Sequence, residues 1–241
     1  MIAATALLAA CSKDEDPAPA RQGLQNVSLS MAAGTGDLIE VPAAIATLSD
    51  EHAMMVDSYA GAINEVCAYL AYFHPPAEAE KGSMQIAASN SRKGAAKNGY
   101  LVYSWTSQDK VIAYQVSQQN DKNVFEVFTK ASDKKWLLHV YAEETADGKK
   151  GQIQVYGPAD GLLASTYTWA RNGDLINIAA LSELQDLQTS ITIHTKSREG
   201  SAEYHIGAAK IYSLTWDTRG NGTWKRYKED GAVAAGGAWR V

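Results

Sequence analysis

The sequence predicts a mainly β protein. We expect a long antiparallel up-and-down meander curled into a barrel or half-barrel, with one N-terminal amphipathic helix (about residues 49–73) packed on it. Three observations lead to this prediction. From residue 100 onward, apolar residues recur with a period of two, as in strands with one buried face. Turn signals separate these runs at short distances. Before residue 100, one stretch has helical periodicity instead.

The helix is predicted from an apolar stripe with helical spacing. Ser49 is a suitable N-cap, and Asp50 and Glu51 place negative charge in the first turn, where the helix dipole favours it. Pro75 and Pro76 end the helix. Because such a stripe is typical of core packing, we expect the helix to cover the meander. The residues of the stripe are Val56, Tyr59, Ala60, Ile63, Val66, Cys67 and Leu70.

Short segments flank this helix. Residues 26–31 alternate in polarity and could form a first strand, which the Gly34-Thr35-Gly36-Asp37 segment would end. The residues between the helix and position 100 show only a weak alternation at Met84-Gln85-Ile86. We therefore expect a loop or a short edge strand there.

The first part of the meander can be tested by pairing its strands across four predicted turns, at Gln108-Asp109, Asn120-Asp121, 131–134 and Asp147-Gly148. All four hairpins keep one face apolar. Since a one-residue slip would invert a whole face, this agreement supports the assignment. The predicted pairs are Leu101–Val116, Tyr103–Tyr114, Trp105–Ile112, Val116–Phe125, Tyr114–Val127, Thr129–Trp136, Val127–Leu138, Phe125–Val140, Val140–Val155 and Ala142–Ile153.

The same alternation continues to the C-terminus, so that we expect about 10–12 strands from residue 100 on. Residues 181–188 interrupt it as a longer loop or one helical turn. The last strands hold Trp216, Trp224 and Trp239, and no exact internal repeat is visible. Turns at Asn172-Gly173, Glu199-Gly200 and 207–209 predict the pairs Trp169–Ile176, Tyr167–Ile178, Ile193–Ile206, Thr195–Tyr204, Lys196–Glu203 and Tyr204–Tyr212.

Composition excludes some classes of protein. The chain has 241 residues, 46% of them hydrophobic, and a net charge of −5 from 22 basic and 27 acidic residues. This length and composition suit a globular domain. The absence of a basic cluster argues against nucleic-acid binding. We expect a monomer.

The first ten residues are almost wholly apolar and end in small residues, as in a secretory signal peptide. They are too few to span a bilayer, which takes about 20 apolar residues. The usual basic segment is missing, so we expect the true start to lie a few residues upstream. Leu8-Ala9-Ala10-Cys11 resembles the lipobox of bacterial lipoproteins. The resemblance implies that Cys11 becomes an acylated N-terminus and holds the protein on the membrane, because several acyl chains bind lastingly.

The residues after Cys11 suggest a destination. The run Ser12, Lys13, Asp14, Glu15 and Asp16 is similar to the acidic export signal of Bacteroidota lipoproteins, which implies an outer-membrane lipoprotein at the cell surface. A periplasm-facing lipoprotein with a solvated acidic linker is the alternative. The expected organisation is a partial signal peptide (1–10), a lipidated Cys with a flexible tether (11–25), and a single β-rich domain (26–241). If Cys11 carries lipid, Cys67 is a free thiol in the core.

No catalytic residue or cofactor is predicted. The chain lacks the signature motifs of serine hydrolases, nucleotide-binding proteins and zinc proteases. The Glu199-Gly200 turn would place His194 opposite His205 on the polar face, where two imidazoles could hold a metal ion. A zinc site needs at least a third protein ligand, so two solvated histidines are the favoured reading and no metal site is predicted.

The aromatic residues are the other candidates. Six Trp, twelve Tyr and only three Phe favour rings with a polar group, as at binding surfaces. Most fall on the apolar face and are core residues in the first instance. If the curled sheet is too wide for its side chains to fill, however, the same face lines a pocket. Its walls would then include Trp105, Tyr114, Tyr167 and Trp169.

Three function hypotheses follow. The first is a lipid-anchored, non-enzymatic binding protein of the cell envelope, whose cavity or concave face takes an apolar or amphipathic ligand. The architecture is loosely similar to periplasmic lipoprotein carriers and to lipocalin-type barrels. The second is a surface interaction or structural lipoprotein that uses exposed aromatic residues, for example as an accessory in glycan capture. The third is a hydrolase, which requires a cleft with two acids about 5–10 Å apart.

Overall fold

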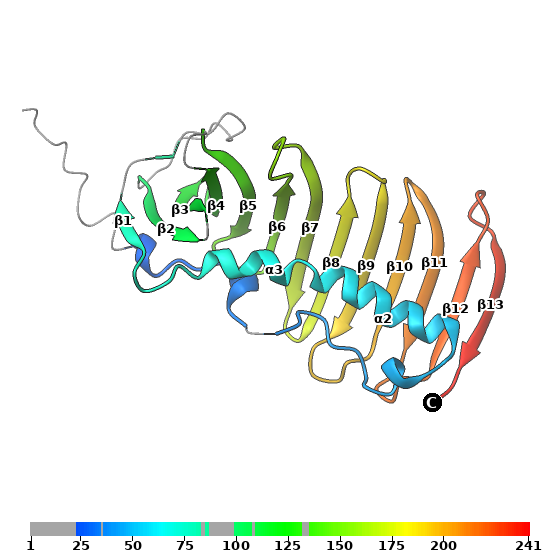
Figure 1. The fold of residues 1–241 in the computed structure, drawn as a ribbon. Helices are drawn as coiled ribbons and strands as arrows, with labels where there is room; N and C mark the ends of the chain where they lie inside the picture. Colours follow the sequence, from blue (N-terminus) through cyan, green and yellow to red (C-terminus); the bar gives the residue numbers. More distant parts are fainter. Residues whose placement is uncertain (1–22, 35, 83–84, 87–98, 108, 132–134) are drawn as a thin grey trace, which may run out of the picture.

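In the described part of the chain, thirteen strands form one antiparallel sheet, in which they lie side by side in sequence order (Figure 1). The computed structural model describes residues 23–34, 36–82, 85–86, 99–107, 109–131 and 135–241. The strands are β1 (Glu80–Gly82), β2 (Leu101–Ser107), β3 (Lys110–Gln119), β4 (Lys122–Ala131), β5 (Leu137–Thr145), β6 (Lys150–Tyr156), β7 (Leu163–Asn172), β8 (Leu175–Ser182), β9 (Leu187–His194), β10 (Gly200–Ile206), β11 (Ala209–Trp216), β12 (Gly222–Tyr227) and β13 (Val233–Trp239).

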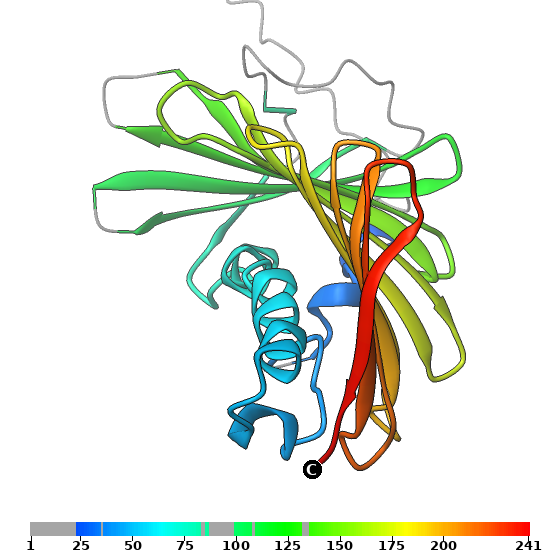
Figure 2. The same ribbon diagram turned by 90° about the vertical axis from the view of Figure 1, so that its right-hand side faces the viewer.

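The sheet is curled but not closed. The edge strands β1 and β13 have one neighbour each, and Figure 2 shows the strongly twisted sheet with the helical elements on its concave side. This confirms the predicted meander, in its half-barrel form. The helical elements are η1 (Ser30–Ala32), η2 (Ile45–Thr47), α2 (Glu51–Asn64), α3 (Cys67–Leu70) and η3 (Ala71–Phe73).

The predicted helix is present, as α2, α3 and η3, and it crosses the concave face from one end of the sheet to the other (Figure 1). At its start, His52 stacks on Trp224 of β12, with ring centroids 3.8 Å apart. At its end, Phe73 packs edge-on against Tyr114 of β3, at 5.6 Å. The apolar stripe thus lies in the main core, between helix and sheet.

The start of the helix differs from the prediction. Asp50, not Ser49, is the N-cap, and its carboxylate accepts the backbone N–H groups of His52 and Ala53 at 2.9 and 3.1 Å. A carboxylate at this position also interacts favourably with the helix dipole.

The strand predicted over residues 26–31 is wrong. That segment leads into the 3-10 helix η1, and Leu29 and Met31 are buried in the main core. A six-residue alternation can bury its apolar side chains without pairing to a strand. Between the helix and residue 100, where a loop or a short edge strand is expected, the structure has the edge strand β1. This strand lies before the alternation at Met84-Gln85-Ile86, of which Gln85 and Ile86 are not in a strand and Met84 lies outside the described residues.

The pairing of the first two hairpins is confirmed, as is that across Asp147-Gly148 and the pair Tyr204–Tyr212. Asn120 and Asp121 both have positive φ, as the predicted two-residue turn requires. Gln108 and residues 132–134, from two predicted turns, lie outside the described residues.

Three predicted registers are wrong. Phe125 pairs with Ala142 instead of Val140, because the strands are displaced by two residues and an irregularity follows Val127. The β7–β8 turn is Gly173-Asp174, so that Trp169 faces Ile178. The β7–β8 displacement and the β4–β5 displacement before the irregularity are even, which preserves the face on which each side chain lies. Beyond the irregularity, Leu138 pairs with Phe128 instead of Val127, so its side chain lies on the face opposite to the one predicted. The break between strands predicted over residues 181–188 is shorter in the structure, where only residues 183–186 form a turn.

The third error is larger. The turn between β9 and β10 covers residues 195–199, so that Gly200 pairs with Ile193 and Tyr204 pairs with Thr189. The predicted pairs Ile193–Ile206, Thr195–Tyr204 and Lys196–Glu203 do not form. Arg198, with a positive φ, allows the chain to reverse before Glu199.

A second apolar cluster lies on the convex face of β2–β5. It includes Val102, Phe128 and Leu138, with Ile86 packed against it. Between these strands, buried Gln115 donates to Glu126 at 2.7 Å and accepts the N–H of Ile86 at 2.8 Å. Alternation predicted one buried face, whereas this end of the sheet has two.

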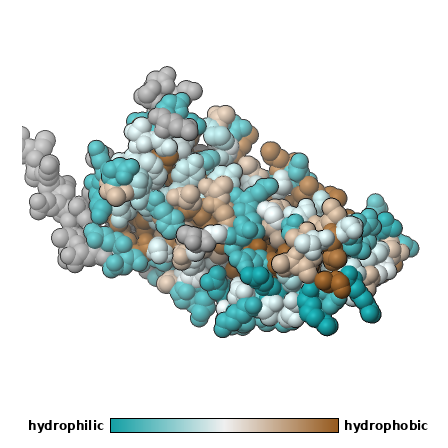
Figure 3. Space-filling model, turned by 60° about the horizontal axis from the view of Figure 1, so that its bottom comes forward, coloured by the Kyte–Doolittle hydropathy of each residue, from teal (hydrophilic) through white to brown (hydrophobic). Residues whose placement is uncertain are grey.

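The surface over the helical elements is mixed, with hydrophobic patches separated by hydrophilic side chains (Figure 3). Among the described residues, no helix is long and apolar enough to cross a membrane. The predicted signal peptide, Cys11 and the export residues 12–16 lie outside the described residues.

Candidate functional site

The four aromatic residues proposed as pocket walls do not converge on one site. Tyr114, Tyr167 and Trp169 are buried in the main core, and Trp105 is half-buried against it. Tyr114, on β3, borders one small cavity near Phe73, whereas Tyr167 borders another on β7, four strands away in the sheet. Of the four residues, only Tyr167 lines the candidate site described next.

The candidate site is a pocket between α2 and the concave face of β7–β10, with a cavity volume of about 370 Å³. This lies within the range of small-molecule sites, roughly 300–1,000 Å³. We call it the tyrosine pocket. It is lined by Ser58, Tyr59, Ala62, Glu65, Ser165, Tyr167, Ala180, Leu181, Ser182, Gln185, Leu187, Thr189 and Tyr204.

The strand register explains why the sheet is hollow here. Tyr167 pairs with Ala180, Ala180 with Thr189, and Thr189 with Tyr204, so the four side chains form one row on the concave face. Adjacent strands lie about 4.8 Å apart, which places the two tyrosines roughly 14 Å from each other. The small side chains of Ala180 and Thr189 cannot fill the space between them.

A second row deepens the hollow. Ser165 of β7 pairs with Ser182 of β8, which pairs with Leu187 of β9. Two residues along each strand bring a side chain back to the same face, so these residues lie beside the tyrosine row. The floor therefore carries hydroxyl groups next to apolar surface.

Helix α2 forms the opposite wall. Ser58, Tyr59, Ala62 and Glu65 share one helix face, because residues three or four apart are neighbours there. Tyr59 stacks on Tyr204, with ring centroids 5.5 Å apart and ring planes 14° from parallel. This stack closes the β10 side of the pocket.

The electrostatics of the pocket are simple. Its lining includes one carboxylate, Glu65, and no lysine, arginine or histidine. Burial raises the pKa of Tyr167 to about 12, and the nearby charge of Glu65 adds to the shift. The pKa of Tyr59 is also raised, mainly by burial and next by the neighbouring Tyr204. The tyrosines are therefore neutral hydrogen-bonding groups at ordinary pH, and an anionic ligand would find no positive partner.

The structure separates the two candidate metal ligands. His205 pairs with Gln188 at one end of the β9–β10 ladder, whereas His194 lies at the other end, 3.6 Å from Asp174. The predicted opposition of the two histidines fails because the Glu199-Gly200 turn does not form. The described residues contain no group of three or more His, Cys, Asp or Glu side chains that could hold a metal ion.

Cys67 is a free thiol, half-buried against the main core. Its sulfur lies 3.6 Å from the Gly36 carbonyl oxygen, and burial raises the pKa of the thiol. A raised pKa reduces the thiolate fraction, which agrees with the structural role expected for this residue.

Sequence reasoning missed most of the tyrosine pocket. Tyr59 was assigned to the core stripe, and the predicted registers gave Ala180 and Thr189 no place beside Tyr167 and Tyr204. The available signal was the pair of small residues on an otherwise bulky face, which becomes visible only in the correct register. A scan against protein-family models finds no match for the chain, and a search of curated proteins finds no similar sequence.

Proposed function

We propose that this protein is a lipid-anchored, non-enzymatic binding protein of the bacterial cell envelope, and that the tyrosine pocket holds a small, amphipathic ligand without negative charge. The observation that carries the proposal is the gap left by Ala180 and Thr189 between Tyr167 and Tyr204. The anchor rests on Leu8-Ala9-Ala10-Cys11, and the outer-membrane surface location rests on the acidic run at 12–16.

The chemistry of the lining supports this ligand class. Tyrosine rings offer flat apolar faces and hydroxyl groups, while Ser165, Ser182 and Thr189 add hydroxyls on the floor. The helix occupies the centre of the concave face, so the remaining space suits one or two rings better than a whole lipid. Glu65 at the helix wall favours a neutral or cationic ligand.

The two other hypotheses have less support. The large exposed apolar side chains among the described residues are Met54, Leu162, Leu184, Ile206, Val233 and Val241, and none is aromatic. An interaction surface of exposed rings therefore has no counterpart in this part of the chain. A hydrolase needs two carboxylates facing one ligand, whereas the tyrosine pocket contains Glu65 alone.

The test is a ligand-observed NMR screen of the purified domain against neutral and cationic ring compounds, including monosaccharides. The informative variant is Ala180→Leu, which fills the floor of the pocket. Its matched control is Ala179→Leu, at the neighbouring position of the same strand, on the opposite face of the sheet.

We expect compounds that bind the wild type to lose at least about tenfold in affinity with Ala180→Leu and to keep their affinity with Ala179→Leu. Urea unfolding of both variants checks that the fold is retained. A screen without hits, or hits that bind equally to both variants, would refute the proposal.

A further inference from the structure

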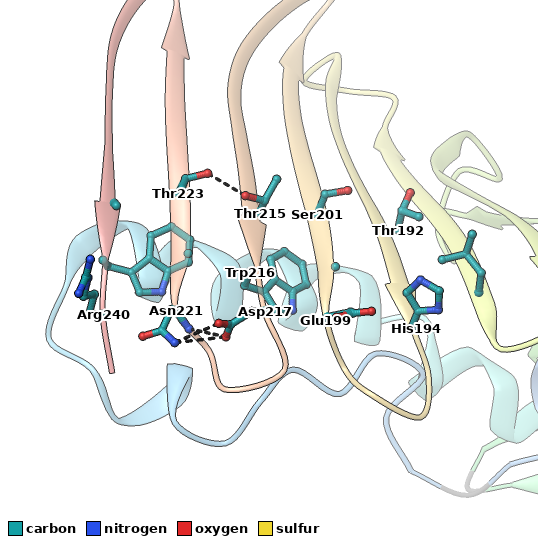
Figure 4. A pocket seen from close by; sticks show the side chains of 15 residues that line it. Thr192, His194, Glu199, Ser201, Thr215, Trp216, Asp217, Asn221, Thr223 and Arg240 are labelled. Carbon is teal, nitrogen blue, oxygen red and sulfur yellow. Dashed lines mark hydrogen bonds between the residues drawn. The ribbon is translucent and has the colours of Figure 1, made fainter.

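A second hollow lies on the other face of the sheet. It crosses β9–β13 near the turns that follow β9 and β11, and has a cavity volume of about 630 Å³ (Figure 4). Thr192 lies between core residues Ile191 and Ile193, so its side chain points away from the helix. We call this hollow the convex groove.

The floor of the groove is a row of small side chains, one from each strand, and those from β9–β12 carry hydroxyl groups. Thr192 pairs with Ser201, Ser201 with Thr215, and Thr215 with Thr223, which pairs with Ala238. Figure 4 shows the hydroxyl-bearing members of this row above the charged and amide side chains of the groove. At about 4.8 Å per strand interval, it extends roughly 19 Å across the sheet.

The hydroxyls of this row are ordered by hydrogen bonds. The Thr215 and Thr223 hydroxyls lie 2.7 Å apart, and Thr192 accepts from Asn177 at 2.7 Å. Ser201, between these pairs, has no hydrogen-bond partner for its hydroxyl within the described residues. The floor thus presents a regular line of donors and acceptors.

The wall of the groove carries charges of both signs. His194, Glu199, Asp217, Asn221 and Arg240 follow one another along its lower side in Figure 4. The Asp217 carboxylate accepts the N–H groups of Arg219 and Asn221 at 2.9 and 3.0 Å, and the side-chain amide of Asn221 at 3.0 Å, which holds the wall in place.

Two wall groups remain available to a ligand. The Glu199 carboxylate and the Arg240 guanidinium have no side-chain hydrogen bond or ion pair within the described part of the chain. The hydrogen bonds from Asn221 hold the pKa of Asp217 below its ordinary value, so this carboxylate stays ionised and does not supply a proton. The arrangement suits binding more than cleavage.

An extended glycan chain matches this geometry. Its sugar units repeat along the chain with a spacing close to one strand interval, and each offers several hydroxyls to hydroxyl, carboxylate, amide and guanidinium groups. The mixed charge of the wall gives no advantage to a polyanion, which excludes nucleic acids and acidic polysaccharides as preferred ligands.

We propose that the convex groove is a second binding site, which takes a neutral polysaccharide chain lying across β9–β13. It is separate from the tyrosine pocket, because the two sites lie on opposite faces of the sheet and share no lining residue.

The test is native gel electrophoresis of the purified domain in gels that contain a soluble polysaccharide. The neutral probes are dextran, soluble starch, xylan and galactomannan, and alginate is the anionic probe. The first variant is Thr215→Val with Thr223→Val, which removes both partners of one hydrogen bond and leaves neither unpaired. The second variant is Arg240→Ala.

The matched control is Thr168→Val, an exposed threonine on the same face of the sheet, on β7 and outside the groove. We expect at least one neutral polysaccharide to retard the wild type and Thr168→Val equally. The apparent dissociation constant should rise about tenfold in the double variant and at least threefold in Arg240→Ala, as the loss of one to two hydrogen bonds predicts. Equal urea midpoints confirm that the variants are folded.

Three outcomes would overturn the proposal. They are no retardation by any neutral probe, retardation by alginate alone, and retardation that the groove variants leave unchanged. Ala180→Leu separates the two sites, because it should abolish ligand binding in the tyrosine pocket and leave the retardation intact. Loss of retardation in Ala180→Leu alone would assign the glycan to the tyrosine pocket and refute the convex groove.

Discussion

The indole of Trp239 lies over Gly222, its partner across the β12–β13 ladder, and donates its Nε1–H to the Gly220 carbonyl at 2.7 Å. Any side chain at position 222 would overlap the indole. The same arrangement occurs in two earlier hairpins. The corresponding sets are Trp216 with Gly200 and the Arg198 carbonyl, and Trp169 with Gly151 and the Gly148 carbonyl.

This pairing predicts strong coupling between positions 222 and 239. Gly222→Ala should destabilise the protein by about 1–3 kcal/mol through overpacking. Trp239→Ala should cost about 3–5 kcal/mol through the loss of a buried ring. A methyl group at 222 would lie against both the indole and the Thr215 carbonyl oxygen. Because the overlap with the indole disappears in the double variant, that variant should be more stable than additivity predicts. Urea unfolding of all four proteins measures the coupling.

The control for this cycle is Gly61→Ala. Gly61 lies in α2, and a Cβ there would have no atom within 4 Å. Since alanine is the better helix former, this variant should be more stable than the wild type by about 0.5–1 kcal/mol. Additive effects at 222 and 239 would contradict the proposed packing.

The N-cap gives a second prediction. Asp50→Ala removes the acceptor for two backbone N–H groups of α2 and should lower the free energy of unfolding by about 1 kcal/mol. Ser49→Ala should have little effect, because Ser49 lies outside the cap. Chemical denaturation of the two variants distinguishes them, and an equal loss in both would show that the cap is shared.

A third prediction concerns pH. Buried Glu144 accepts the N–H of Ser30 at 3.0 Å, and burial raises its pKa above the ordinary value of 4.5. The folded state therefore binds the proton more tightly than the unfolded state. The resulting stabilisation is complete below about pH 4.5 and is lost as the pH rises through the raised pKa of the folded state.

Glu144→Gln keeps an oxygen for Ser30 but removes the titration. Relative to the wild type, we expect this variant to gain stability as the pH rises through the folded-state pKa. Urea unfolding at a series of pH values measures the difference. Glu229→Gln, on an exposed turn, should show no such pH dependence. A difference between Glu144→Gln and wild type that stays constant with pH would contradict the raised pKa.

The sequence was most informative where a turn has a fixed length. The Asn120-Asp121 turn fixes the β3–β4 register, and alternation then places Tyr114 and Phe125 in the core. Longer connections do not fix the register, because a loop such as 195–199 can close at several lengths. The tyrosine pocket depends on the registers across the longer turns 183–186 and 195–199, and on the register across Gly173-Asp174, where the two-residue turn lies one residue later than predicted. Its floor was therefore not predictable.

Other features were hidden by variable spacing. The Gly–Trp hairpins recur three times, but the number of residues between the glycine and the tryptophan differs in each. A repeat of fixed period is therefore absent from the sequence, although the contact is the same. The N-terminal motif differs from these hairpins, because its residues are adjacent in the sequence and can be recognised without knowledge of the fold.

That motif gives the fourth prediction. In its native host, the mature protein should begin with an acylated Cys11, which mass spectrometry of the N-terminal peptide detects. Cys11→Ala should release the protein from the membrane fraction, whereas Cys67→Ala should leave it there. An unmodified Met1 in the mature native protein would refute the anchor.

The last prediction concerns the destination of the anchored protein. If the run at 12–16 is an export signal, replacing Asp14, Glu15 and Asp16 by Ala should protect the protein from protease added to intact cells. The exchange Asp14→Glu, Glu15→Asp and Asp16→Glu preserves the charge and should leave the protein accessible. Both variants retain Cys11, so both should stay in the membrane fraction. Equal accessibility of wild type and alanine variant would show that the acidic run is only a solvated linker.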